Sequence, residues 1–468
     1  MMKASVKNEL KRFLGSENAS FSDEDRLCYG YDATGELFRP DGVVFPRDAG
    51  DVAFVLKTAC AEGFAVVPRG AGSGFTGGSL PVRGGVVLST ERMNRIVEVD
   101  EANLTALVEP GVVTGELQDR VEALGLFYPP DPTSLKFCTI GGNIAECAGG
   151  PRAVKYGVTR DYVLGLEAVL PTGEIIETGT AAAKGVVGYD LTRLLVGSEG
   201  TLGVVTGARL RLVPRPLALK TLRAVFADVA CAASAVAEIT GARIVPCTLE
   251  LMDGECIRCV EEYAGLDLGG AGAMLLIEVD GAAEAVEGEA ARIAELCRAA
   301  GAVEVRAAAD GAERRELWKA RRAMSPALSR LRPRKINEDV VVPRARIVEL
   351  VDGVREVAGR REVLIACFGH AGDGNIHVNV MIDDSDADEA ARGEAAVRDV
   401  FELALRLGGT ISGEHGIGTS KAPYLSMELS AEVVALMKRI KAAFDPMGVL
   451  NPGKVFPGEA AAGRAASP

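Results

Sequence analysis

The sequence predicts an α+β protein of two or three domains, and three observations support this. At 468 residues, the chain is too long for one ordinary hydrophobic core. Helix-like and strand-like segments alternate along its length, and the apolar fraction of 48% is typical of globular proteins. The 55 glycines are in excess, which indicates loops whose backbone approaches a ligand closely.

The first part of the chain, up to about Pro214, has the pattern of one α+β unit. Apolar residues recur at helical spacing over Asp51–Glu62 and stop at Gly63, so this segment is expected to be a helix. A second helix is expected over Thr114–Leu124, where Gly125 follows. Strands are expected at Ala65–Val67, Gly85–Leu88, Ile96–Val99, Leu104–Glu109, Tyr162–Leu170 and Glu174–Glu177.

Beyond Pro216 the elements become longer, which predicts a second domain with an antiparallel sheet and helices on one face. Strands are expected at Leu219–Phe226, Met274–Val279, Asp339–Val342, Val363–Phe368 and His377–Met381. Helices are expected at Val229–Thr240, Ala282–Ala300, around Trp318, at Asp388–Leu407 and at Ala431–Phe444. The expected division is a helical segment (1–37), a first domain (38–214), a second domain (215–450), a segment returning to the first domain (451–457) and a disordered tail (458–468).

Charge and composition exclude several classes of function. A formal net charge of -13 without long basic runs argues against nucleic acid as a partner. No apolar run is long enough to cross a bilayer, and the N-terminal stretch lacks the apolar region of a signal peptide, so a cytoplasmic protein is expected. The cysteines are scattered, unlike a secreted disulfide framework. Cys256 and Cys259 form a lone CxxC, either two small apolar groups on one helix face or a redox or metal pair.

A glycine-rich loop, P-R-G-A-G-S-G-F-T-G-G at Pro68–Gly78, follows an expected strand. Its successive backbone N–H groups can form a concave nest suited to a pyrophosphate, although it has neither the Rossmann nor the Walker spacing. For this loop alone, a mobile linker is the alternative. Further loops favour a large ligand with phosphates and a flat ring system: P-P-D-P-T-S at Pro129–Ser134, G-G-N-I-A at Gly141–Ala145 and G-S-E-G-T-L-G-V-V-T at Gly197–Thr206.

Together, and in this order, these segments resemble the FAD-binding domain of the vanillyl-alcohol oxidase and p-cresol methylhydroxylase superfamily. The resemblance implies a FAD-binding domain of two α+β subdomains over residues 38–214, followed by an antiparallel-sheet substrate (cap) domain with helices. Some relatives tether the flavin through a histidine in the first loop, but this chain has Ser73 there and no histidine before His370, so FAD is expected to be non-covalent. The residues implied to hold FAD are Pro68, Arg69, Gly70, Ala71, Gly72, Ser73, Gly74, Pro129, Asp131, Thr133, Ser134, Gly141, Gly142, Asn143, Ala145, Gly149, Gly200, Gly203, Val205 and Asn451.

All three histidines of the chain lie between His370 and His415. His370 and His377 end strand-like runs that flank a glycine-containing turn, a geometry that can bring both imidazoles to one point. With Glu414 they make a set suited to a divalent metal with open positions for substrate. His415 has the intrinsic pKa of a general base near neutrality. The alternative is that these are satisfied core histidines in glycine-rich turns.

This constellation resembles the C-terminal domain of the D-lactate, glycolate and D-2-hydroxyglutarate dehydrogenase branch of the superfamily. The resemblance implies that His370, His377 and Glu414 bind a metal, commonly zinc, with manganese or ferrous iron also suited to the ligands. It implies that His415 is the general base. The closing N-P-G-K-V-F at Asn451–Phe456 is a further hallmark of the branch.

A carboxylate substrate also requires fixed cations. By the same resemblance, Arg321 and Lys335 are expected in the substrate pocket, where arginine offers a bidentate fork and lysine a point charge. Asn379 shares a strand face with His377 and is the third substrate candidate. For the two basic residues the alternative is a solvated helix face, because further arginines surround them.

The expected function is a FAD-dependent dehydrogenase that oxidises a D-2-hydroxy acid, D-lactate first, to the 2-oxo acid by hydride transfer to flavin N5. The alternatives are glycolate or D-2-hydroxyglutarate as substrate, a non-redox transferase resembling alkyl-glycerone-phosphate synthase, a non-catalytic flavoprotein subunit, and a flavin-free metallohydrolase. No motif selects the electron acceptor. An iron–sulfur subunit or an electron-transfer flavoprotein is expected as the partner, and only such a partner would place the chain at a membrane.

Overall fold

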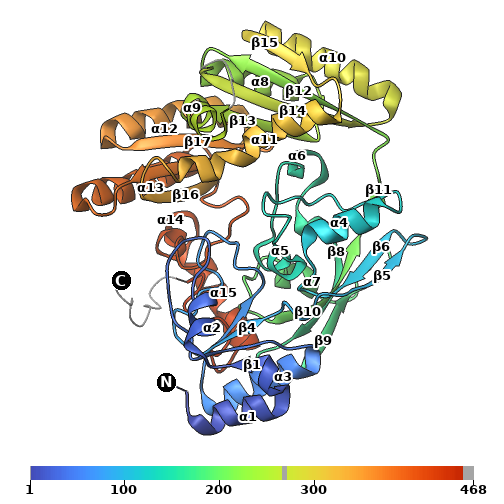
Figure 1. Ribbon diagram of the computed structural model, residues 1–468, viewed down its shortest axis with the longest axis vertical. Coiled ribbons are helices and arrows are strands. Elements are labelled where there is room, and N and C mark those ends of the chain that lie inside the picture. Colours follow the sequence, from blue (N-terminus) through green and yellow to red (C-terminus); the bar gives the residue numbers. More distant parts are fainter. Residues whose placement is uncertain (1, 266–270, 457–468) are drawn as a thin grey trace. The chain divides into compact units, whose positions relative to one another are not determined.

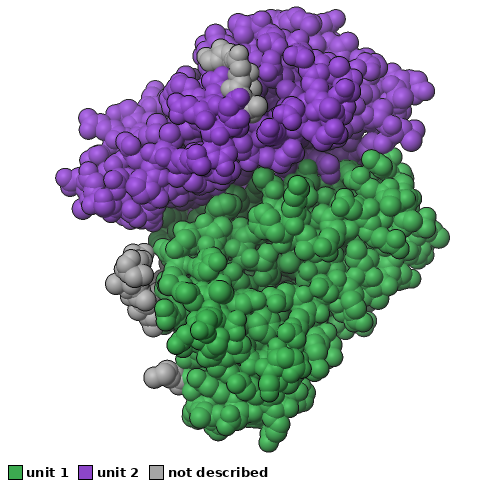
Figure 2. All heavy atoms as spheres, in the orientation of Figure 1, with its two compact units in different colours: residues 1–148, 158–215, 414–468 green, residues 149–157, 216–413 purple. Residues whose placement is uncertain are grey.

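The computed structural model describes residues 2–265 and 271–456, which form two compact units (Figures 1 and 2). Unit 1 comprises residues 1–148, 158–215 and 414–468, and unit 2 comprises residues 149–157 and 216–413. The expected tail at 458–468 lies outside the described residues. Among the described residues, no helix combines the length and the hydropathy needed to span a membrane.

The first sheet of unit 1 has the order β1-β2-β4-β3. Strands β2, β4 and β3 run parallel, and β1 pairs antiparallel with β2. The helix expected after Asp51 is α3 (Ala49–Glu62), which begins at the Asp48 cap and ends at Gly63 in the left-handed conformation. Its apolar face packs with α1 (Ala4–Leu14) and the sheet in one core. The strands are β1 (Ala19–Ser20), β2 (Gly42–Val44), β3 (Val66–Arg69) and β4 (Val86–Ser89).

The second sheet of unit 1 is antiparallel and has the order β5-β6-β10-β8-β9. Its strands are β5 (Ile96–Asp100), β6 (Thr105–Val108), β8 (Val163–Val169), β9 (Ile175–Gly179) and β10 (Val204–Arg211), and a small pair joins β7 (Leu126–Phe127) to β11 (Val213–Pro214). The helices of unit 1 also include α2 (Asp23–Cys28), α4 (Thr114–Glu122), α5 (Ile140–Glu146), α7 (Leu191–Leu195), α14 (Leu425–Glu428) and α15 (Ala431–Phe444). Unit 1 thus has the two α+β subdomains that the resemblance implied.

Unit 2 is built on one antiparallel sheet of seven strands, in the order β15-β12-β14-β13-β17-β18-β16. Its strands are β12 (Ala218–Phe226), β13 (Thr248–Asp253), β14 (Ala273–Gly281), β15 (Ala302–Ala307), β16 (Arg334–Val341), β17 (Leu364–His370) and β18 (Asn375–Ile382). Its helices are α6 (Ala153–Tyr156), α8 (Val229–Gly241), α9 (Gly254–Ala264), α10 (Ala283–Ala299), α11 (Gly311–Leu328), α12 (Ile347–Arg361) and α13 (Ala387–Arg406).

The expectation that helices cover only one face of this sheet is wrong. Every residue of β18 is buried, which requires cover on both faces because side chains alternate along a strand. Helices α9 and α11 pack on Met252, Met274 and Phe368 in one apolar cluster. Helices α8, α10, α12 and α13 contact one another and the sheet as a second group (Figure 1). The sequence pattern did not separate these two layers.

Compared with the expected ranges 38–214 and 215–450, the two units keep a boundary after residue 215 but place two other segments, 149–157 and the residues from 414 onward, in the opposite unit. Residues 149–157 belong to unit 2 because Lys155 donates to the backbone carbonyl of Asp280 at 2.6 Å and Tyr156 donates to its carboxylate at 2.8 Å. Residues from 414 onward belong to unit 1, where Lys441 donates to the carbonyl of Thr201 at 2.7 Å. Long-range polar contacts of this kind leave no local signal in the sequence.

Candidate active site

The hairpin of β17 and β18 carries two of the predicted metal ligands. His370 is the last residue of β17, and His377 stands in β18 opposite Phe368. The turn between them requires Gly374, which has a φ of 91° and whose Cβ would lie 2.0 Å from the carbonyl oxygen of Val342. The two imidazole centroids are therefore 5.1 Å apart, and both residues are buried.

Glu414 follows directly on the last residue of unit 2. Gly413 donates its N–H to the buried carboxylate of Asp339 at 2.9 Å, and Ser412 donates its hydroxyl to the same carboxylate at 3.2 Å. Asp339 stands opposite His377 in the β16–β18 pairing, so it holds the segment that presents Glu414. One ligand atom each from His370, His377 and Glu414 lie within 4.8 Å of one another. These are the three residues predicted as ligands from the sequence, and their role in binding a metal stays a prediction.

A buried carboxylate that the sequence analysis did not single out supports this trio. Glu250 in β13 accepts from His370 Nδ1 at 2.5 Å and from Arg321 Nε at 2.6 Å. Burial alone would raise the pKa of Glu250, but its interactions with His370 and Arg321 lower it to about 2. With Nδ1 used as a donor to Glu250, the other ring nitrogen of His370 is the one suited to a metal, so the residues fit the implied ion. The sequence offered one signal that could have identified Glu250, namely a single acidic residue within the mainly apolar segment T-L-E-L-M at 248–252.

The three substrate candidates differ in their surroundings. Arg321 lies in α11 with a side chain that is 4% exposed, so it is not part of a solvated helix face. Its Nη2 is buried and has no hydrogen-bond partner within the described part of the chain. Lys335 is half-buried and donates to the hydroxyl of Ser325 at 2.5 Å, and burial lowers its pKa. Asn379 is fully buried and donates to the carbonyl of His377 at 3.2 Å.

In unit 1, three of the predicted flavin segments lie beside one another. The first loop approaches the start of α5, which carries the segment Gly141–Ala145. A Cβ on Gly70 would lie 2.3 Å from Oγ1 of Thr139, the residue just before this helix. The first loop meets the segment Gly197–Thr206 at Pro68, because a Cβ on Gly200 would lie 3.3 Å from the side chain of Pro68. The segment at Pro129–Ser134 follows β7 and is anchored through Gln118, which donates to the carbonyl of Pro130 at 2.8 Å.

Two predicted flavin residues lie in other elements of the chain. Gly149 belongs to the segment of unit 2 that begins at this residue, whereas Val205 lies within β10 opposite Ala168. Their assignment to the flavin stays a prediction.

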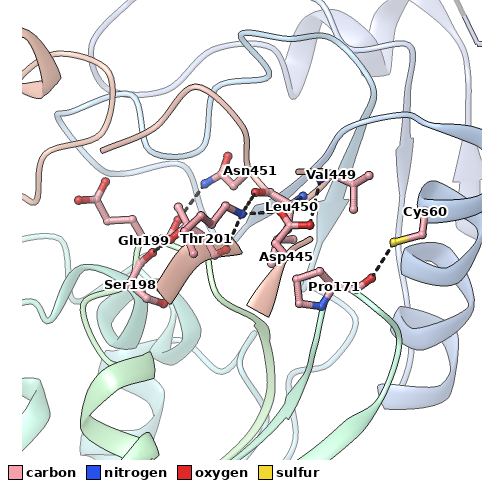
Figure 3. A network of polar contacts seen from close by, with 10 residues as sticks. Cys60, Pro171, Ser198, Glu199, Thr201, Asp445, Val449, Leu450 and Asn451 are labelled. Carbon is pink, nitrogen blue, oxygen red and sulfur yellow. Dashed lines mark hydrogen bonds and ion pairs between the residues drawn. The ribbon is translucent and has the colours of Figure 1, made fainter. Parts of the chain in front are cut away.

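The segment that carries His415 is tied to the flavin loops through a buried glutamate. The carboxylate of Glu199 accepts the N–H groups of Ile417 at 2.8 Å and Gly418 at 2.6 Å. The backbone carbonyl of Glu199 accepts from Asn451 Nδ2 at 2.8 Å (Figure 3). Burial raises the pKa of the Glu199 carboxyl, and the two N–H groups oppose this shift. The same Asn451 amide donates to the carbonyl of Gly78 at 2.9 Å, so the C-terminal N-P-G-K-V-F segment closes on the first loop.

The CxxC pair lies in α9, and the structure confirms the helix-face interpretation. Cys256 and Cys259 are both free and buried in the apolar cluster that joins α9 to α11. Burial raises the pKa of both thiols, which disfavours the reactive thiolate.

Known protein families and individual relatives match this chain over nearly its whole length. Residues 40–179 match the FAD binding domain family, and residues 215–455 match the family described as FAD linked oxidases, C-terminal domain. The chain is 48% identical to glycolate oxidase subunit GlcD of Bacillus subtilis (strain 168), over 97% of both chains. It is 36% identical to D-lactate dehydrogenase of Anaerostipes hadrus, over 94% of this chain and 93% of that one. The structure of p-cresol methylhydroxylase with substrate bound superposes with a TM-score of 0.80 at 18% identity, over 96% of each chain, which shows a shared fold.

Proposed function

Because this chain belongs to the FAD-linked oxidases, in the branch of glycolate oxidase subunit GlcD and D-lactate dehydrogenase, we propose that it is a FAD-dependent dehydrogenase of small 2-hydroxy acids. The observation that carries the proposal is the assembled trio of His370, His377 and Glu414 with Arg321 bonded to the same carboxylate as His370. We propose glycolate as the first substrate and D-lactate as the second. This reverses the order expected from the sequence, since the GlcD relative is more similar than the lactate dehydrogenase relative.

Two bound groups complete the proposed site. FAD, held by the glycine loops of unit 1, supplies the two-electron acceptor that oxidation of an alcohol to a carbonyl requires. A divalent ion, held by His370, His377 and Glu414, supplies a Lewis acid for the substrate hydroxyl. Two imidazoles and one carboxylate suit zinc, manganese and ferrous iron, and measurement of the metal content of the purified protein decides among them.

The protein's own residues bind and orient the acid. The buried Nη2 of Arg321 is a donor without a partner within the described part of the chain, and a substrate carboxylate would satisfy it with a charge-assisted hydrogen bond. Lys335 and Asn379 are proposed to contact the same substrate. His415 is proposed to take the hydroxyl proton as the carbon is oxidised, because a neutral imidazole is a competent base near pH 7.

A partner is proposed from the relative's name. The GlcD relative is named as a subunit of glycolate oxidase, and we propose that this chain also delivers electrons to another polypeptide. An iron–sulfur subunit or an electron-transfer flavoprotein would serve. Co-purification of the tagged chain from its native host, followed by reduction of the partner with substrate, tests this.

The decisive experiment is an anaerobic titration of the purified chain with glycolate, D-lactate and L-lactate, in which the flavin absorbance band is followed. We expect glycolate and D-lactate to bleach the band, and L-lactate not to. Chelator treatment should slow bleaching, and added Zn²⁺ should restore it. A flavin that none of these acids reduces would favour the non-redox transferase. A protein without bound flavin would refute the proposal.

A further inference from the structure

Glu250 occupies a central position between two parts of the proposed site. Its two carboxylate oxygens have different partners, since Oε1 is 2.5 Å from His370 Nδ1 and Oε2 is 2.6 Å from Arg321 Nε. We propose that Glu250 is a positioning residue that fixes both the metal ligand His370 and the substrate-binding Arg321. This inference rests on the proposed function and deepens it.

The strand register places the first of these contacts. Glu250 and His370 are directly opposite each other in the β13–β17 pairing, so their side chains leave the same face of the sheet. A carboxylate only accepts hydrogen bonds, so His370 must carry its proton on Nδ1. The lone pair of Nε2 is then directed away from Glu250, in the tautomer that a metal ligand requires.

The second contact comes from α11. The guanidinium of Arg321 lies 4.7 Å from the ring centroid of Phe368, which is the strand neighbour of His377. Because Nε donates to Glu250, the guanidinium is held in place, and its Nη2 is a buried donor without a partner in the described part of the chain. Glu250 is fully buried, and water cannot replace it in either contact. One side chain therefore determines the spacing between the metal ligand and the carboxylate-binding donor.

The neighbouring strand offers a matched control. Glu278 in β14 is also buried and also pairs with an arginine of α11, since it accepts from Arg314 Nε at 2.7 Å and from Trp318 Nε1 at 2.8 Å. The carboxylate of Glu278 instead bonds to Thr221, Arg314 and Trp318. If the two glutamates only held α11 on the sheet, replacement of either one should affect folding in the same way. Zn²⁺ affinity, in contrast, should depend on Glu250 alone.

The test measures Zn²⁺ affinity of the FAD-loaded protein, freed of metal, by competition with a chromophoric chelator. We expect Glu250→Gln to weaken Zn²⁺ binding by about 10- to 100-fold, the usual effect of losing such an outer partner. Glu278→Gln should bind Zn²⁺ as the wild type does. Arg321→Met should keep Zn²⁺ affinity and lose affinity for glycolate, because Glu250 still accepts from His370.

The outcomes separate the inference from the function on which it rests. Equal Zn²⁺ affinity in Glu250→Gln and wild type would overturn the role of Glu250 while the metal site stands. A wild type that binds no Zn²⁺ would refute the metal site itself. If Glu250→Gln does not fold because Arg321 is left as a buried charge, the double variant Glu250→Gln with Arg321→Met decides, and it should show the same loss of Zn²⁺ affinity.

Discussion

The hydroxyl of Thr76, in the first glycine loop, donates a hydrogen bond of 3.0 Å to the backbone carbonyl of His415. The carbonyl of Thr76 accepts in return from the N–H groups of Thr419 at 2.8 Å and Ser420 at 3.1 Å. The segment that carries the proposed base is therefore bonded to the loop that is proposed to hold the FAD pyrophosphate. The base and the flavin loops belong to one compact unit, although more than 300 residues separate Thr76 from His415 in sequence (339 positions).

Replacement of His415 tests its role as the base. His415→Gln should slow reduction of the flavin by glycolate by about 10²- to 10⁴-fold, because the hydroxyl proton then has no positioned acceptor. Single-turnover stopped-flow absorbance measures this rate. FAD and metal content should match the wild type, since neither group is proposed to bind this side chain. A variant that reduces its flavin at the normal rate would exclude His415 as the base.

The flavin should leave the protein without breaking a covalent bond. The first glycine loop contains no histidine that could tether the flavin, and none of the three histidines of the chain precedes His370. Trichloroacetic acid should therefore release all of the yellow colour into the supernatant. Flavin fluorescence that stays with the washed protein pellet would contradict this.

Asp445 should be a strong contributor to stability at the C-terminal end of unit 1. Its buried carboxylate accepts from Lys441 Nζ at 2.5 Å and from the N–H groups of Val449 at 3.1 Å and Leu450 at 2.9 Å (Figure 3). Asp445→Ala leaves these donors without their acceptor, which should lower the free energy of unfolding by about 3 kcal/mol. Urea unfolding of the protein measures the change. Arg439→Ala, an exposed change in α15, the helix that ends just before Asp445, should stay within about 0.5 kcal/mol of wild type.

Lys454 should make stability depend on pH in the alkaline range. Burial lowers its pKa from 10.5 to about 8, against the opposing charges of Glu199 and Asp32. The unfolded chain therefore binds more protons than the folded chain between these values, so the contribution of Lys454 to stability should rise as pH increases from about 8 to 10.5. Below about pH 8 the ammonium group of Lys454 is charged in the folded protein, so the full free-energy cost of burying this charge lowers stability.

The measurement compares the wild type with Lys454→Met by urea unfolding at pH 7.5 and pH 10 (about 2.5 pH units apart, spanning the lowered pKa). The difference in unfolding free energy between the two proteins should shift in favour of wild type at the higher pH. A difference that is the same at both values would show that Lys454 titrates normally. Subtracting the variant removes the contribution of tyrosines and cysteines that titrate in the same range.

Local features of the structure could be predicted from the sequence because they depend on near neighbours. The α3 helix follows from its apolar spacing, its Asp48 cap and its terminating Gly63. The meeting of His370 and His377 follows from two strands joined by a turn with a glycine. These features need few contacts from distant parts of the chain, so pattern and spacing were sufficient.

The role of Glu250 could not be predicted from local sequence patterns. Its role depends on pairing with a strand 120 residues away and on a helix that packs Arg321 over the same face. The covering of both sheet faces in unit 2 and the return of residues after 413 to unit 1 depend in the same way on distant partners.

The sequence by itself determined the family, the cofactor class and the identity of the candidate ligands. Loops that approach a phosphate closely require glycine, and a metal site requires ligating side chains such as histidine, so both can be recognised from residue types alone. The tertiary structure decided which acids support those ligands and which arginine lies beside them. A buried carboxylate is stable only where folding supplies its donors, and these donors come from strands and helices that are remote along the chain.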